Sequence, residues 1–160
     1  MRTPKLKKKH KRHRARLHGE LLLRLHLESN PEALGLVRAV LERAAEFFHC
    51  PETESRAIVR SVDEALANVI RHAYKERAGM PIEVTLRRLY AGSGKQGACG
   101  LEILVRDEGI PLDKKKLRGR PLGEIRPGGL GLHFMKHSMD KIEFQRKNGK
   151  NVLRMVKFLD

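Results

Sequence analysis

The sequence lacks tryptophan, has only 4% aromatic residues, and contains two cysteines in 160 residues. Cys50 and Cys99 lie far apart and do not form the C-x-x-C spacing of structural zinc sites. Two isolated cysteines in a chain with enough apolar residues for its own core fit a reducing compartment, where disulfides are rare. We therefore expect a cytoplasmic protein without a structural zinc site.

Long apolar runs are also absent. No run approaches the roughly 18 residues that a membrane span requires. The apolar residues 21–23 are interrupted at once by Arg24 and His26, and no small-residue cleavage site follows. The basic start also lacks the serines of a transit peptide, so it is not a typical targeting segment. These absences predict no association with a membrane.

Acidic residues are missing from residues 1–16, which hold nine of the 34 lysines and arginines. The rest of the chain has 25 basic and 19 acidic residues, a balance of +6, whereas the whole chain has +15. A block of like charges repels itself, so we expect residues 1–18 to be a disordered tail and residues 19–160 to be the domain. The tail could bind nucleic acid through counterion release, or it could serve only solubility.

The remaining apolar residues follow strand and helix periods and suit one domain with a single core. Ser29-Asn30-Pro31-Glu32 is typical of a helix start, and this helix should end near His49. A second helix should begin near Pro51 and end before Gly79. The expected strands are 20–28, 82–86, 100–106, 141–146 and 151–158, and the third expected helix is 128–139.

The predicted order is strand, two helices, two strands, a long loop, a helix and two strands. This order indicates an α/β (α+β) two-layer sandwich, in which a mostly antiparallel sheet carries its helices on one face. Residues 108–127 lose all periodicity and are rich in proline, glycine and basic residues. A polar loop of this length in a compact domain is often functional.

Three short patterns in this frame can carry chemistry. The first is Glu64, Asn68 and His72, which lie at positions i, i+4 and i+8 of the second helix and therefore share a stripe. A carboxylate and an amide one turn apart can bracket Mg²⁺, which prefers oxygen ligands. The carboxylate could also accept a proton from a nucleophile. The alternative is an ordinary solvated helix face.

The second pattern is Asp107-Glu108-Gly109. Asp107 ends an apolar strand, and Gly109 permits a sharp turn after it. A carboxylate at a strand end can accept a hydrogen bond from the exocyclic amino group of adenine. The alternative is an ordinary Asp-x-Gly turn.

The third pattern is Gly128-Gly129-Leu130-Gly131 at a helix start. Glycines at this position expose backbone N–H groups, and phosphate can approach the positive end of the helix. Cations in the preceding loop could close over a polyphosphate. They are Lys114–Lys116, Arg118, Arg120 and Arg126. The alternative is a flexible basic loop.

Together the three patterns resemble a known family. The segment EALANVIRHAY (Glu64–Tyr74) resembles the N box of GHKL (Bergerat-fold) ATPases. Asp107-Glu108-Gly109 is similar to their first glycine box, and GGLGLHFMKHSMD (Gly128–Asp140) to their second. The short chain and the sequences of these three motifs are most similar to the anti-sigma regulatory factors of bacteria, a serine/threonine protein kinase family. The resemblance covers roughly residues 20–158.

This resemblance implies a histidine-kinase-like ATPase fold that uses ATP and Mg²⁺. It makes Asn68 a ligand of Mg²⁺, Glu64 the general base and Asp107 the partner of the adenine amino group. It also makes Arg126 a candidate for contact with the γ-phosphate, with Arg118 and Arg120 as further candidates. The other residues expected around ATP are His72, Gly109, Gly128, Gly129, Leu130 and Gly131, with residues 112–127 as the ATP lid.

One position departs from the family pattern. The first glycine box usually reads Asp-x-Gly-x-Gly, but Pro111 occupies the place of the second glycine. Proline has no N–H and a fixed φ, which removes a backbone donor and hinge freedom at this position. Asp107 and Gly109 are unaffected.

The favoured hypothesis is an anti-sigma-factor-type kinase that phosphorylates a serine or threonine of a small antagonist protein. It could also bind a sigma factor and so regulate transcription, and its family often forms homodimers. The alternative is an ATP-dependent protein-binding switch without phosphotransfer. A detached sensor histidine kinase domain is less favoured, because a dimerisation helix pair with a phosphoacceptor histidine does not fit into 160 residues. The tail could support a fourth function, nucleic-acid binding.

Overall fold

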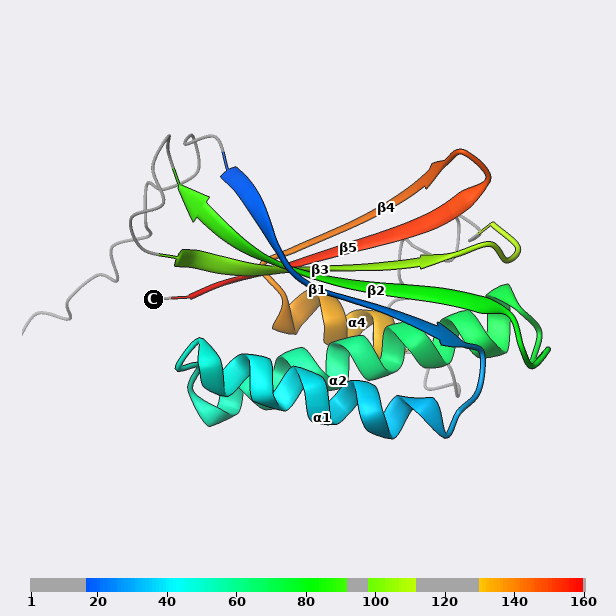
Figure 1. Cartoon of the computed structure of the whole chain (residues 1–160), viewed down its shortest axis with the longest axis horizontal. Coiled ribbons are helices and arrows are strands. Elements are labelled where there is room, and N and C mark those ends of the chain that lie inside the picture. The colour runs from blue at the N-terminus through cyan, green and yellow to red at the C-terminus, as the bar shows by residue number, and fades with distance from the viewer. Residues whose placement is uncertain (1–16, 92–97, 112–129, 160) are drawn as a thin grey trace, which may run out of the picture.

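The computed structural model describes residues 17–91, 98–111 and 130–159 (Figure 1). Five strands and four helical segments follow one another in these ranges. The π-helix η1 continues α2 directly. The elements are β1 (Leu17–Glu28), α1 (Ala33–Phe47), α2 (Glu52–Asn68), η1 (Val69–Ala73), β2 (Pro81–Ala91), β3 (Ala98–Asp107), α4 (Leu130–Ser138), β4 (Lys141–Lys147) and β5 (Lys150–Phe158).

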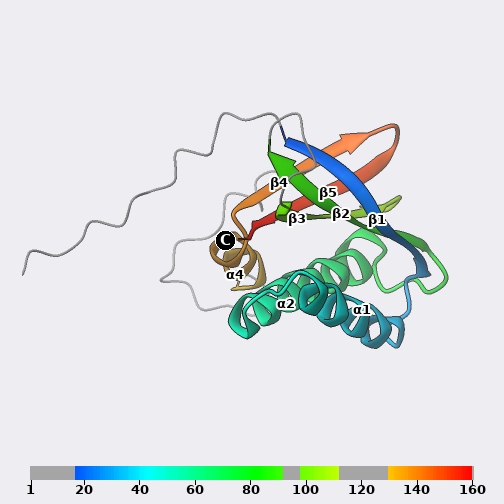
Figure 2. The same cartoon turned by 60° about the vertical axis from the view of Figure 1, so that its left-hand side comes forward.

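The strands form one sheet in the order β1-β2-β3-β5-β4, and every neighbouring pair is antiparallel. The last hairpin of the chain therefore adds to β3 through β5 and leaves β4 at the edge. Figures 1 and 2 show α1, α2 and α4 on one face of this sheet. The predicted two-layer α+β sandwich is confirmed.

The core lies between the helices and the sheet. On α1 the buried residues Val37, Leu41 and Ala45 recur every four positions, which places them on one face of the helix. On β2 the buried residues Val84 and Leu86 alternate with residues on the other face. No helix within the described parts of the chain is long and apolar enough to cross a membrane.

The face of the sheet away from the helices carries ion pairs across the strands. Glu102 on β3 is only 4% exposed. Its carboxylate accepts hydrogen bonds from Arg87 Nη1 at 3.2 Å and from Arg154 Nε at 2.6 Å. A buried carboxylate needs such partners, so the two arginines explain how this position tolerates a charge.

The second helix differs from the prediction. We expected one α-helix that ends before Gly79, but α2 ends at Asn68 and continues as the π-helix η1. The N–H of Tyr74 donates to the carbonyl of Val69 at 2.9 Å, five residues back. Lys75 (φ 51°) and Glu76 (φ 62°) then adopt the left-handed conformation and end the helix. The apolar pattern does not encode this wider turn, because both helix types bury one stripe.

Candidate functional site

The candidate site extends along α2 and η1. The turn after β3 packs on one end of this helical segment, at Ala73, and the start of α4 packs near its middle, at Glu64. Ala73 lies nine positions after Glu64, which is on the order of 13 Å along a helix. A nucleoside triphosphate can span this length.

Asp107 forms the first end of the site. It is the last residue of β3 and is only 6% exposed. Its Oδ1 accepts hydrogen bonds from the N–H of Gly109 at 2.9 Å and from Nδ2 of Asn151 at 2.7 Å. Both of these donors bind the same oxygen, so the carboxylate is held in one orientation.

Burial raises the pKa of the Asp107 carboxyl above its ordinary value. The hydrogen bonds from Asn151 and Gly109, and the positive charge of Arg146, lower this pKa but do not cancel the effect of burial. A carboxylate with few water molecules around it is an acceptor that gains from a donor on a ligand.

The turn that follows Asp107 is fixed to η1. A Cβ on Gly109 would lie 2.5 Å from the carbonyl oxygen of Ala73, so only glycine fits. The N–H of Ile110 donates to the same carbonyl at 2.9 Å. Pro111 is exposed and follows this bond, so its missing N–H does not interrupt the described turn.

Tyr74 also holds the turn after β3 in place. Its side chain is buried, and its hydroxyl accepts a hydrogen bond from the N–H of Glu108 at 2.8 Å and donates one to the carbonyl of Pro81. Burial raises the pKa of the Tyr74 hydroxyl, which therefore stays protonated and able to donate. The phenol thus links the end of η1 to the start of β2 and to the turn after β3.

Glu64 forms the second end. Its carboxylate lies directly against the first turn of α4, because a Cβ on Gly131 would come 2.0 Å from Glu64 Oε1. Arg71 on η1 approaches the same oxygen, with its Nη2 at 3.7 Å. Glu64 is half-buried, and its carboxylate lies between the guanidinium of Arg71 and the start of α4.

Asn68 and His72, the other two residues of the predicted stripe, differ in exposure. Asn68 is the last residue of α2 and is half-buried, between the two ends of the site. His72 is exposed and lies within η1, where the wider turn breaks the regular spacing of the stripe. The described residues contain no group of three or more His, Cys, Asp or Glu that could hold a metal ion.

Part of the predicted site lies outside the described residues. This applies to Arg126, Gly128, Gly129, the other arginine candidates Arg118 and Arg120, and the expected lid at 112–127. Leu130 is the first residue of α4, and its backbone marks the start of that helix.

Sequence reasoning missed three residues of the Asp107 end: Tyr74, Arg146 and Asn151. Tyr74 closes the segment that resembles the N box, but nothing in the local pattern gave its hydroxyl a role. Asn151 lies directly opposite Asp107 in the sheet, and Arg146 lies opposite Asn151. These pairings follow from the insertion of β5 beside β3, which the local sequence does not reveal.

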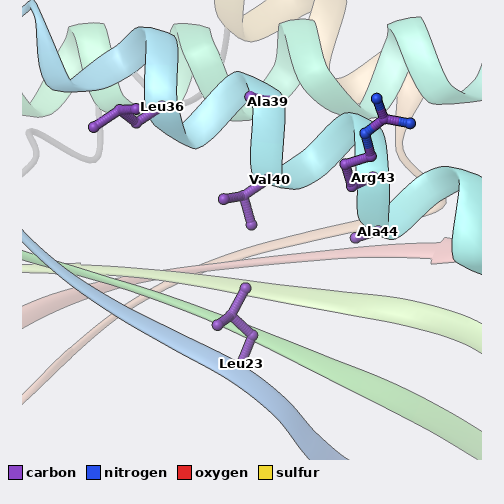
Figure 3. Close-up of a pocket in the computed structure, with 6 residues that line it drawn as sticks. All are labelled: Leu23, Leu36, Ala39, Val40, Arg43 and Ala44. Carbon is purple, nitrogen blue, oxygen red and sulfur yellow. The ribbon is translucent and has the colours of Figure 1, made fainter.

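A separate concavity lies between α1 and β1 (Figure 3). Its volume is about 710 Å³, and it is lined by Leu23, Leu36, Ala39, Val40, Arg43 and Ala44. Leu23 and Val40 point toward one another across it (Figure 3). This groove is almost entirely apolar and shares no lining residue with the site around α2 and η1, so it does not extend the polar site.

Comparison with known proteins gives one family match and several relatives. Residues 27–157 match the model of the histidine kinase-like ATPase domain. The chain is 31% identical over 147 residues to the serine-protein kinase RsbW of Bacillus pumilus (strain SAFR-032). That alignment covers 87% of this chain and 86% of the relative.

Two crystal structures show the same fold. The RsbU and RsbW domains of a Mycobacterium tuberculosis protein match with a TM-score of 0.55 at 17% identity, over 86% of this chain and 33% of that chain. The chain thus spans about a third of that larger protein. The SiaB–SiaC complex from Pseudomonas aeruginosa matches with a TM-score of 0.56 at 13% identity, over 87% of this chain and 91% of that one.

Proposed function

Because this chain belongs to the histidine kinase-like ATPase domain family and is a distant homologue of the RsbW anti-sigma factor serine kinases, we propose that it is an ATP-dependent serine/threonine protein kinase. Its substrate would be a hydroxyl group of a small antagonist protein. The observation that carries this proposal is the pair of carboxylates at the two ends of the site, Asp107 in the turn after β3 and Glu64 against the start of α4.

At the first end, Asp107 would bind the base of ATP. Its half of the site is rigid, because Gly109, Ile110 and Tyr74 fix the turn to η1. Its carboxylate can accept a hydrogen bond from the amino group of adenine. The helical segment then leads from this turn towards Asn68 and Glu64, where the phosphates would lie.

At the second end, Glu64 would act as the general base. It would take the proton of a serine or threonine hydroxyl while that oxygen bonds to the γ-phosphorus. The bond between the γ-phosphorus and the bridging oxygen breaks, and ADP leaves with that oxygen. Bound Mg²⁺ would supply neutralisation of phosphate charge, with Asn68 as its protein ligand. We further propose that Arg126, Gly128, Gly129 and the start of α4 contact the phosphates.

The proposed partner is a small antagonist protein, with a sigma factor as a second partner. One of the matched structures is a complex between two proteins, which supports a role in partner binding. One observation favours the alternative, an ATP-dependent binding switch without phosphotransfer. Arg71 lies 3.7 Å from Glu64 Oε1, and an ion pair of this kind could keep the carboxylate from acting as a base.

The experiment that separates kinase from switch is Glu64→Gln, which keeps the shape of the side chain but removes its basicity. In a kinase, ATP affinity survives while phosphotransfer falls by roughly 10²–10⁴-fold. The assay combines radiolabelled ATP with an antagonist recovered from the native host on immobilised protein with ATP and Mg²⁺. Glu52→Gln is the matched control, because Glu52 is an exposed carboxylate at the far end of α2.

Asn68→Ala in the same assay should weaken both ATP binding and transfer, because the metal loses its protein ligand. Transfer by Glu64→Gln at the wild-type rate would remove Glu64 from the mechanism. If the wild-type chain transfers no phosphate but binds the partner only with ATP, the switch replaces the kinase.

A further inference from the structure

We propose that Asn151 and Arg146 determine the base specificity of this site, because Asn151, oriented by Arg146, donates to one oxygen of Asp107 and leaves only the other to meet the base. The inference rests on the proposed function, in which Asp107 receives the base of ATP. It concerns two residues of the β4–β5 hairpin, which lies outside the family's N box and glycine boxes.

The three residues form a row across the sheet. Asp107 on β3 pairs with Asn151 on β5, and Asn151 pairs with Arg146 on β4. Asn151 Nδ2 donates to Asp107 Oδ1 at 2.7 Å, and Arg146 Nη1 donates to Asn151 Oδ1 at 2.7 Å. A chain of hydrogen bonds therefore leads from the exposed arginine to the buried carboxylate.

The orientation of the Asn151 amide follows from its neighbours. Besides Asp107, its Nδ2 lies 3.3 Å from the carbonyl oxygen of Gly109 and 3.1 Å from that of Ile110. If the amide were flipped, its oxygen would face these three acceptors and its NH₂ group would face the guanidinium of Arg146. Only the observed orientation matches donors with acceptors, so Arg146 and the turn together fix Asn151 as a donor towards Asp107.

This arrangement makes the two oxygens of Asp107 unequal. Oδ1 accepts from both Gly109 N and Asn151 Nδ2, which uses its two lone pairs. The hydrogen bonds that the described residues donate to Asp107 both end on Oδ1. Within the described parts of the chain, Oδ2 thus remains as the acceptor for a base.

A single acceptor distinguishes purine bases by their edges. Adenine presents one exocyclic amino group, which one carboxylate oxygen can accept. Guanine has an oxygen at that place and offers instead two adjacent donors, N1–H and the 2-amino group, which suit both oxygens of a carboxylate. With Oδ1 saturated, the site cannot offer two oxygens, so it favours adenine over guanine nucleotides.

The test measures the dissociation constants of ATP and GTP by calorimetry with Mg²⁺. Asn151→Ala removes a donor and frees Oδ1, so the preference for ATP over GTP should fall by about tenfold, the effect of one hydrogen bond in a buried site. Arg146→Gln should change the preference in the same direction but less. Asn151→Ser should restore much of the preference, because its hydroxyl can still donate. Gln145→Ala, an exposed residue of the same hairpin, is the control.

An unchanged ratio of the ATP and GTP dissociation constants in Asn151→Ala and Arg146→Gln would overturn the inference. This includes an equal loss of affinity for both nucleotides, which would indicate a purely structural role. Melting curves show whether each variant is folded, and Arg146→Gln keeps the test available if Asn151→Ala unfolds. A wild-type chain that binds neither nucleotide would overturn the proposed function itself. A wild-type chain that binds ATP, with an unchanged ratio in the variants, would overturn this inference alone.

Discussion

At the scale of single residues, Asp107→Asn should reverse the hydrogen-bonding character of the surface that meets the base. The amide oxygen of the variant would turn towards the N–H of Gly109 and Nδ2 of Asn151, which need an acceptor. Its NH₂ group would then replace Oδ2 and face the amino group of adenine, so two donors would meet. ATP binding should weaken by about 1–3 kcal/mol in calorimetry. Inosine triphosphate, which has an oxygen in place of the amino group, should lose less.

The same residue gives a prediction about pH. Burial raises the pKa of Asp107 above its ordinary value of 3.8. The contribution of Asp107 to the free energy of unfolding is therefore fully present below pH 3.8 and is lost as the pH rises through the raised pKa. Urea titrations of wild type and Asp107→Asn between acidic and neutral pH should show wild type losing stability relative to the variant as the pH rises. A difference that is constant with pH, or that favours wild type as the pH rises, would contradict this.

The sequence predicted these residues unevenly. Glu64, Asn68 and Asp107 were singled out because three short local patterns occur in the order that the resembled family shows. In the structure, Glu64 lies on α2, and the turn that follows Asp107 packs on η1, which continues α2. The roles of both residues towards ATP stay predictions. Asn151 and Arg146 were missed because their importance depends on which strand lies beside β3, a non-local fact. His72, which was expected around ATP, is exposed and lies within η1, and its role also stays a prediction.

At the scale of elements, two contacts join α2 and η1 to the rest of the site through glycines. Gly131→Ala would place a Cβ 2.0 Å from Glu64 Oε1, and the carboxylate would have to move because it is the end of a side chain. The fold should survive, but phosphotransfer should fall by roughly 10²-fold, the effect of an ångström-scale displacement of a catalytic group. Gly35→Ala is the matched control, because its Cβ would meet nothing closer than 4.0 Å in α1. Equal phosphotransfer in the two variants would refute the contact between α4 and the base.

Gly109→Ala should act on stability instead. The added Cβ would lie 2.5 Å from the backbone oxygen of Ala73, which cannot move as a side chain can. The turn after β3 would have to separate from η1, at an expected cost of about 1–3 kcal/mol of unfolding free energy. Thermal melts against wild type and Gly35→Ala measure this cost. A melting temperature as high as that of wild type would mean that the turn and η1 are not packed as described.

The elements themselves were largely predictable. Apolar periods of two and about four residues located every strand and both long helices, because burial of one face is a local property of the sequence. The end of α2 was not predictable, since an α-helix and a π-helix bury similar stripes. The left-handed Lys75 and Glu76 were also missed, because neither residue type favours that conformation.

At the scale of the whole molecule, the separation of charge between the tail and the rest gives a further prediction. Deletion of residues 1–16 removes nine basic residues and leaves a balance of +6. ATP affinity and melting temperature should remain nearly unchanged, because the described site draws on residues from Glu64 onward. Any binding to nucleic acid should disappear, and in the full chain it should weaken steeply with added salt. Loss of ATP binding or unfolding after the deletion would show that the tail is part of the domain.

The place of β5 between β3 and β4 also has a consequence for how the protein is made. During synthesis the ribosome adds Asp107 before Arg146 and Asn151. The Asp107 carboxylate is therefore present for a time without the two residues that orient it. A nascent chain that stops before residue 146 can pair β1, β2 and β3, yet the proposed base-binding site would still be incomplete. Competence to discriminate between nucleotides would therefore arise only once β5 has been made, after the other four strands.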